Sequence, residues 1–174
     1  MLSEQFSAGQ NHIRHYISLA RFDHTTKHVF IIPGVALAVL LREVTVPSLI
    51  TNIVLGMSSA ICIASANYVI NEWLDREFDR HHPKKSQRSS VQHVLNPVIV
   101  YAWYALLAVL GLGLALLVNG LFFWISAWFL TMGVIYNVAP LRSKDRPFVD
   151  VLTESINNPI RLLLGWAMVD PTSL

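Results

Sequence analysis

Long apolar blocks separated by short polar connections constrain this chain more than any other feature. Several of the blocks approach the roughly 20 residues that an α-helix needs to cross a bilayer. The blocks run from about 28 to 41, 47 to 74, 97 to 118 and 121 to 140. Only 14% of the 174 residues are charged, whereas a soluble domain carries about a quarter. We therefore predict an all-α, polytopic transmembrane helical bundle.

A fifth block, from Val151 to Val169, is only half apolar. Its polar residues fall at i, i+3, i+4 and i+7 and are Glu154, Asn157, Asn158 and Arg161. Polar residues within a span face the bundle interior or a cavity. The block predicts a fifth span, and its stripe predicts either a polar seam between helices or a cavity wall.

The first 27 residues are mostly polar, so they do not read as a secretory signal peptide. Ile13, Tyr16, Ile17 and Ala20 fall on one helical face, which predicts a short amphipathic helix at the membrane surface; the alternative is a packed helix end. We therefore divide the chain into an N-terminal segment, 1–27, and a transmembrane domain, 28–174. Cys62 is the only cysteine, which excludes a disulfide within the chain.

Lysine and arginine concentrate in three places, before the first block, between the second and third, and after the fourth. Alternate connections lie on alternate sides of the membrane, so these three groups share one side. The positive-inside rule predicts that this side is cytoplasmic, together with the N-terminus. The formal net charge of +2 gives no indication of nucleic-acid binding.

An acidic stripe ends the second block. Asn67, Asn71, Asp75 and Asp79 recur every four residues and share one helical face, with Glu72 on its flank. Like charges at this spacing repel, and carboxylates at a membrane border are costly unless paired. A divalent cation removes both problems, and Mg²⁺ prefers such hard oxygen ligands. We predict that Asn71, Glu72, Asp75 and Asp79 bind Mg²⁺.

A basic loop follows the stripe. Its cations are Arg80, Lys84, Lys85 and Arg88. Carboxylates that hold a metal, beside cations that take phosphate oxygens, suit a metal-bridged diphosphate. The alternative is that Arg76 and Arg80 simply pair with Glu72 and Asp79, while the loop serves topology.

These residues resemble the first aspartate-rich motif of the UbiA superfamily of intramembrane prenyltransferases, Asn-Asp-x-x-Asp-x-x-x-Asp. The motif stands here from Asn71 to Asp79, with Glu72 in place of the usual aspartate. The segment Tyr136–Lys144 is similar to the family's Tyr-Ser-x-x-Pro-x-Arg-x-Lys segment, and Arg21 with Phe22 stands where members often have Arg-Pro.

The resemblance implies a bundle of about nine membrane-spanning helices. In a helix every backbone polar group is hydrogen-bonded within the segment, as a bilayer requires. It also implies a Mg²⁺-dependent cytoplasmic site that transfers an isoprenoid from its diphosphate to a lipid or aromatic acceptor. The expected partners are then these substrates and membrane lipids. Arg142, Lys144 and Arg161 join the loop cations as expected diphosphate ligands.

The family's second aspartate-rich motif does not occur in these 174 residues. We expect either a fragment of a longer product or a shortened relative. The chain alone is expected to bind magnesium with a prenyl diphosphate weakly, if at all, and to show no turnover. Asp75→Ala is expected to abolish activity in a complete enzyme without harming folding, because it removes a repelling charge. The alternatives are phosphoribosyl transfer to a polyprenyl phosphate, a non-catalytic protein that binds lipid diphosphates, and, third, a transporter.

Overall fold

The computed structural model describes residues 13–22, 25–42 and 48–172, and every element in these ranges is helical. Residues 13–19 form a first helix. The elements that follow are η1 (Thr25–Ile31), α2 (Ile32–Leu41), α3 (Leu49–Asp79), η2 (Lys85–Gln87), α4 (Ser89–Gln92), α5 (Pro97–Val118), α6 (Gly120–Asn137), η3 (Ser143–Asp145) and α7 (Pro147–Val169). The all-α prediction is confirmed.

The long helices begin where the sequence supplies caps. The Asn96 side chain accepts the Val98 N–H at the start of α5, and the Asn119 side chain accepts the Phe122 N–H at the start of α6. Pro97 and Pro147 occupy the first helical positions, where a missing N–H costs nothing. The polar connections therefore fix the helix starts.

Three helices, α3, α5 and α6, are long and apolar enough to cross a membrane. The stretch His28–Leu41 is apolar but shorter, and α7 has the length but carries the polar stripe. Large apolar side chains such as Leu40 and Trp124 stand more than two-thirds exposed. Such an apolar outer surface suits lipid better than water.

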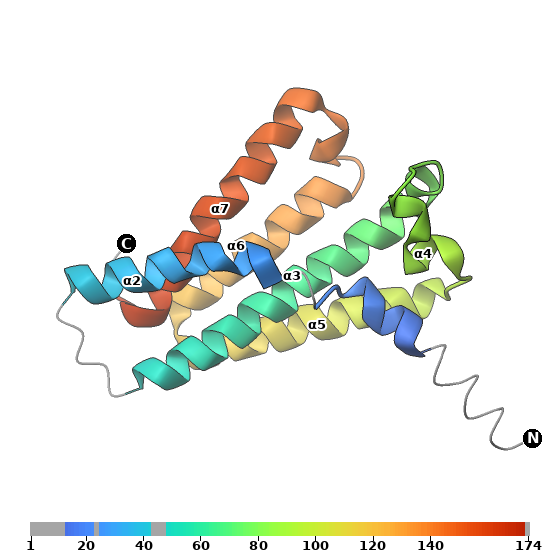
Figure 1. Ribbon diagram of the computed structural model, residues 1–174. Helices are drawn as coiled ribbons and strands as arrows, with labels where there is room; N and C mark the ends of the chain where they lie inside the picture. The colour runs from blue at the N-terminus through green and yellow to red at the C-terminus, as the bar shows by residue number, and fades with distance from the viewer. Residues whose placement is uncertain (1–12, 23–24, 43–47, 173–174) are drawn as a thin grey trace, which may run out of the picture.

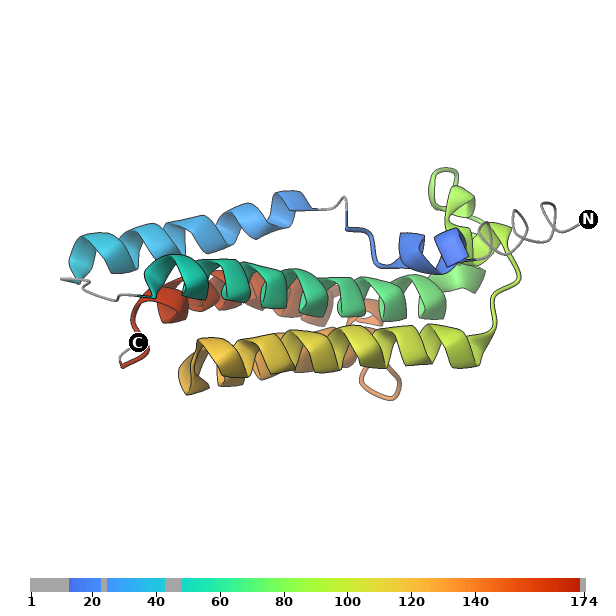
Figure 2. The ribbon, with the colours of Figure 1, turned by 90° about the horizontal axis from the view of Figure 1, so that it is seen from below.

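The helices form an elongated bundle (Figures 1 and 2). α3 packs against α5 and α6, and α7 packs against α6 and α2. α6 and α7 diverge from α3 toward one end of the bundle (Figure 1). Gly34 of α2 and Gly165 of α7 lie where these two helices meet, and a Cβ at either position would collide with the backbone of the other segment. Glycine at these positions allows the close approach.

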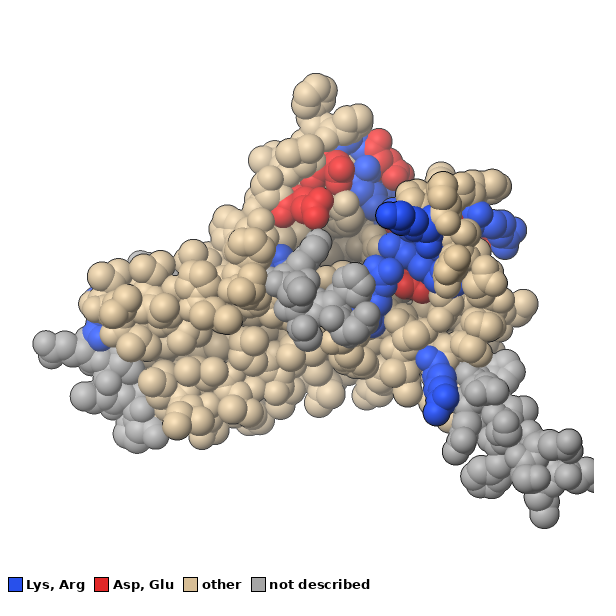
Figure 3. All heavy atoms as spheres, in the orientation of Figure 1, with Lys and Arg blue, Asp and Glu red and all other residues tan. Residues whose placement is uncertain are grey.

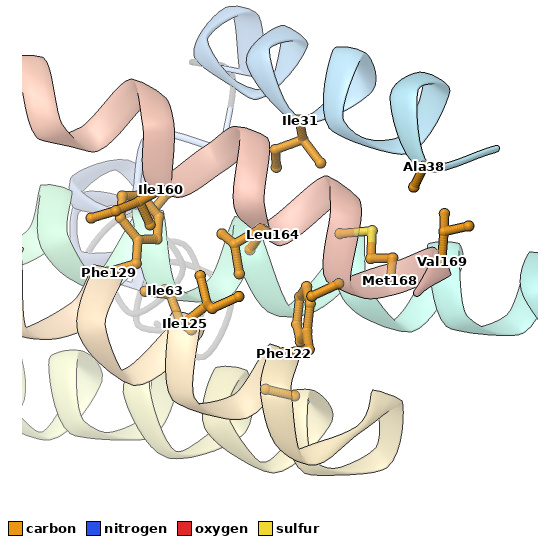
Figure 4. Close-up of a cluster of buried hydrophobic side chains, with 14 of the residues drawn as sticks. Ile31, Ala38, Ile63, Phe122, Ile125, Phe129, Ile160, Leu164, Met168 and Val169 are labelled. Carbon is orange, nitrogen blue, oxygen red and sulfur yellow. The ribbon is translucent and has the colours of Figure 1, made fainter. Parts of the chain in front are cut away.

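Two apolar clusters hold the bundle together. In the larger, Ile63 of α3, Phe122 of α6 and Leu164 of α7 meet beneath η1 and α2 (Figure 4). In the smaller, Leu19 and Ala20 pack against α3 and α5 and are fully buried. The first helix is therefore fastened to the bundle, while its opposite face remains exposed.

Candidate functional site

A cavity of about 460 Å³ lies among α3, α6, α7 and the connections at the end where these helices diverge. Lys, Arg, Asp and Glu side chains gather around a hollow between α7 and the end of α3 (Figure 3). The inner wall is more apolar and includes Ala64, Phe129 and Gly133. The cavity thus combines a charged end with an apolar wall.

The polar stripe of α3 forms one side of the cavity. Asn67, Asn71, Asp75 and Asp79 all line it, as expected for residues spaced one helical turn apart. α3 continues through Asp79, beyond the predicted end of the apolar block, so the whole stripe is helical. The Asn71 amide donates to the Asn137 side-chain oxygen at 2.6 Å, which joins α3 to α6.

Asp75 is the centre of the charge arrangement. One of its carboxylate oxygens lies 2.7 Å from the Lys144 ammonium and 2.9 Å from a guanidinium nitrogen of Arg142. Both cations belong to the connection after α6, and Arg142 also pairs with Asp145 at 2.7 Å. The segment Tyr136–Lys144 therefore places two cations opposite the acidic stripe.

Lys144 is the more enclosed of these two cations. Its ammonium also donates to Asn137 at 2.8 Å, and its side chain is 9% exposed. Burial lowers the pKa of Lys144 from the usual 10.5, and the neighbouring Asp75 carboxylate opposes that shift. Lys144 therefore loses its charge at a lower pH than an ordinary lysine does.

Asp79 lies at the end of the stripe next to the loop that carries η2 and α4. It forms a direct ion pair with Arg88, and the Lys85 ammonium lies 3.9 Å away. Its side chain is almost completely buried. Lys85 lines this cavity, whereas Arg88 lines a second cavity.

Glu72 does not join the other residues of its motif. It lines a second cavity, where Arg21 lies 3.2 Å from its carboxylate and the Ser90 N–H donates to it at 3.4 Å. The reason is geometric, because residue 72 is rotated about 100° around the helix from residue 71. The structure therefore separates Glu72 from Asn71, Asp75 and Asp79, although the sequence predicted one ligand set.

The seven predicted diphosphate cations lie in three different places. Those that line the main cavity are Lys85, Arg142, Lys144 and Arg161. Lys84 and Arg88 line the second cavity, and Arg80 is exposed and lies 3.4 Å from Glu77. Arg76 also lies beside Glu77, at 3.7 Å. Among the ion pairs of the described residues, Arg76 and Arg80 pair with Glu77 and not, as the alternative had it, with Glu72 and Asp79.

The polar stripe of α7 faces the cavity rather than a dry helix seam. Glu154, Asn157 and Arg161 line it, whereas Asn158 is exposed. Arg161 is 7% exposed and its guanidinium stacks 4.9 Å from the Phe129 ring. Its Nε has no hydrogen-bond partner in the described residues. A buried guanidinium with an unused donor suits an anionic or polar ligand.

Asn137 is the functional candidate that the sequence reasoning missed. It is 3% exposed, accepts from both Asn71 and Lys144, and donates to the Gly133 carbonyl at 2.8 Å. It stands where the resemblance led us to expect serine, and that departure was the available signal. Its amide connects the acidic stripe to the cations.

No three His, Cys, Asp or Glu side chains in the described part of the chain lie close enough together to hold a metal by themselves. This arrangement is compatible with Mg²⁺, which commonly takes one or two carboxylates and completes its shell with water and substrate phosphate. Asp75 and Asp79, with the amide of Asn71, provide such a partial set. The donor chemistry therefore fits a metal that arrives with a phosphorylated ligand.

Curated relatives share sequence with much of this chain. A 4-hydroxybenzoate octaprenyltransferase of Alcanivorax borkumensis is 31% identical over 121 residues, which cover 70% of this chain and 41% of the relative. A lycopene elongase/hydratase of Corynebacterium glutamicum is 29% identical over 104 residues, which cover 58% of this chain and 36% of that relative. The chain thus spans less than half the length of these relatives.

A UbiA homolog from Archaeoglobus fulgidus, whose structure was solved with DMAPP and Mg²⁺, has the same fold, with a TM-score of 0.76. The two sequences are 21% identical, and the match covers 91% of this chain and 55% of the homolog. A second structure of a UbiA homolog from that organism, bound to GPP and Mg²⁺, matches with a TM-score of 0.75. Residues 30–173 match the model of the UbiA prenyltransferase family. Because this family model matches most of the chain and three helices are long and apolar enough to span a membrane, the chain is an integral membrane protein that belongs to the UbiA prenyltransferase family.

Proposed function

We propose that this chain carries the magnesium and diphosphate site of a prenyltransferase, which moves an isoprenoid from its diphosphate to an acceptor within the membrane. The observation that carries the proposal is the meeting of Asp75 with Arg142 and Lys144 at the charged end of one cavity. The relatives' names and the ligands of the solved homologs agree with it.

Asp75, Asp79 and the amide oxygen of Asn71 would hold Mg²⁺. In the structure, Arg142 and Lys144 neutralise Asp75 directly. With a magnesium diphosphate bound, Asp75 and Asp79 would face the metal, and Arg142 and Lys144 would donate to phosphate oxygens in place of Asp75. The exchange keeps every charge paired, which matters where the surroundings are poor in water.

Bound Mg²⁺ supplies charge neutralisation for the departing diphosphate. Lys85, Arg142, Lys144 and Arg161 orient the phosphate oxygens and balance the negative charge that grows as the carbon–oxygen bond breaks. The allylic carbon then bonds to the acceptor, which gives up a proton. Phe129 and Tyr136 line the cavity and keep water from the reactive carbon.

The apolar inner wall favours an isoprenoid donor over phosphoribosyl diphosphate. Ala64, Phe129 and Gly133 offer carbon surface to a hydrocarbon chain, and a ribose would leave its hydroxyls against them without partners. The names of two relatives contain 4-hydroxybenzoate, an aromatic acid, and lycopene, a hydrocarbon. We therefore propose a lipid or aromatic acceptor.

We also propose that the cavity opens toward the cytoplasm. Arg21, Lys85, Arg142 and Lys144 come from three different basic groups, yet all line this one cavity. One end of the bundle thus gathers the groups that the positive-inside rule assigns to the cytoplasmic side.

The test measures binding and consumption of labelled geranyl diphosphate by the 174-residue chain in lipid nanodiscs, with and without Mg²⁺. We expect Mg²⁺-dependent binding to the native chain and to Glu77→Gln, an exposed acid near the same helix end, but not to Asp75→Asn. Binding that ignores Mg²⁺, or a preference for phosphoribosyl diphosphate, would contradict the proposal. Consumption of the donor distinguishes catalysis from binding alone.

A further inference from the structure

The second cavity lies outside the proposed reaction. It measures about 490 Å³ and is bounded by the first helix, the end of α3 and the loop that carries η2 and α4. Figures 1 and 2 both show the first helix beside this loop. Of its lining residues, Arg21 alone also lines the main cavity, so Arg21 forms the wall between the two.

Specific contacts fix the first helix as a wall of this cavity. The Ser18 and Ser89 hydroxyl oxygens lie 2.6 Å apart, and the Tyr16 hydroxyl accepts the Asn96 N–H at 2.9 Å. The His15 and His93 rings stack with centroids 3.5 Å apart. The cavity is therefore held by contacts between segments that are distant in sequence.

Positive charge exceeds negative charge in the lining. Arg21, Lys84 and Arg88 face a single lining carboxylate, Glu72, which pairs with Arg21. Arg88 pairs with Asp79, which does not line this cavity. Lys84 is exposed, and no ion pair among the described residues includes it. An anion at this place would neutralise the remaining charge.

Apolar side chains accompany these cations. Ile17 and Phe22 line the cavity and are 46% and 42% exposed, and Ile13 on the same helix is 62% exposed. The cavity lies at the end of α3, one of the helices long enough to cross a membrane, where lipid headgroups are expected. Cations at headgroup depth beside exposed apolar side chains match a phospholipid better than a free anion.

We propose that this cavity binds an anionic phospholipid. The headgroup phosphate lies against Lys84 and Arg21, and the acyl chains run along Ile17 and Phe22. Inorganic phosphate shares the charge but lacks the acyl chains, so it binds far more weakly. The bound lipid ties the first helix to the loop and thereby steadies Arg21, which both cavities share.

The chain supplies a matched pair of variants for the test. Lys84 lines the second cavity and the adjacent Lys85 lines the main one, so Lys84→Gln and Lys85→Gln change the net charge equally at neighbouring positions. The purified 174-residue chain is analysed by native mass spectrometry with dioleoyl phosphatidylglycerol, with dioleoyl phosphatidylcholine and with inorganic phosphate. Lys84 is exposed and the Lys85 side chain is 46% exposed, so we expect both variants to fold, which their thermal unfolding verifies.

We expect one phosphatidylglycerol to be retained by the native chain and by Lys85→Gln. Lys84→Gln is expected to weaken retention roughly fivefold, the effect of one cation near a headgroup. Equal retention by the two variants would overturn the proposal. It would also be overturned by equal retention of phosphatidylcholine, or by inorganic phosphate displacing the lipid at equal concentration.

Discussion

The Lys144 ammonium and the Asp75 carboxylate lie 2.7 Å apart, although they belong to segments that are distant in the sequence. α3 supplies the acid, and the connection after α6 supplies the base. The pair is reinforced by Asn137, which hydrogen-bonds both Lys144 and Asn71. These contacts join the aspartate-rich segment and the Tyr136–Lys144 segment into one polar centre.

Asp75→Asn is expected to reduce Mg²⁺-dependent binding of geranyl diphosphate by about 10² or more, because a charged metal ligand is lost from the cavity. The substitution also leaves Arg142 and Lys144 without their shared carboxylate. We therefore expect a loss of unfolding free energy of about 1–3 kcal/mol. This replaces the expectation from sequence that removal of Asp75 leaves folding unchanged. Calorimetric binding and thermal unfolding in detergent measure the two effects, with Glu77→Gln as the control.

Binding of geranyl diphosphate is expected to weaken at alkaline pH. The loss should begin at a lower pH than the pKa of 10.5 of an ordinary lysine would predict. Burial lowers the pKa of Lys144, so its ammonium becomes neutral earlier as the pH rises. Lys144→Arg keeps the charge and should move the loss of binding to higher pH. A pH titration of affinity for both proteins gives the comparison, and identical profiles would exclude Lys144 as the titrating group.

Glu72→Gln is expected to retain most Mg²⁺-dependent binding, unlike Asp75→Asn. Glu72 contacts Arg21 and the Ser90 N–H instead of the main cavity. Its neutralisation should loosen the first helix, which limited proteolysis between that helix and α3 would detect. Loss of Mg²⁺ affinity as large as that of Asp75→Asn would show that Glu72 is a ligand after all.

Gly165→Ala is expected to destabilise the bundle by about 1–3 kcal/mol, because the added methyl meets the backbone of Ile31 and α2. Gly113→Ala is the control, since a Cβ there meets nothing within 4 Å. Alanine at an open helical position is neutral or slightly stabilising. Thermal unfolding of both variants in the same detergent compares them, and equal midpoints would refute the close packing of α2 and α7.

A cysteine introduced at His81 is expected to react with a membrane-impermeant reagent from the cytoplasmic side only, and one at Gly120 from the opposite side only. Both positions are exposed; His81 follows the end of α3 and Gly120 begins α6 after α5, so the two positions lie at opposite ends of α5. The native Cys62 is replaced by serine in both proteins. The reverse labelling pattern would contradict the proposed orientation.

The sequence by itself determined the helices and the polar stripe on α3. Apolar blocks of bilayer length leave few alternatives to helices, since every backbone polar group in lipid must be satisfied within its own segment. The four-residue spacing from Asn67 to Asp79 then places these residues on one face, because helical geometry depends only on local distances. The family resemblance followed from the same local pattern.

Tertiary structure alone decided which charges meet. The neighbours Lys84 and Lys85 line different cavities, and Glu72 turns toward Arg21 while Asn71 turns toward Asn137. Adjacent residues on a helix point about 100° apart, so their partners depend on which helix packs on each side. That packing is set by long-range contacts such as the meeting of Gly34 and Gly165, which no local spacing in the sequence specifies.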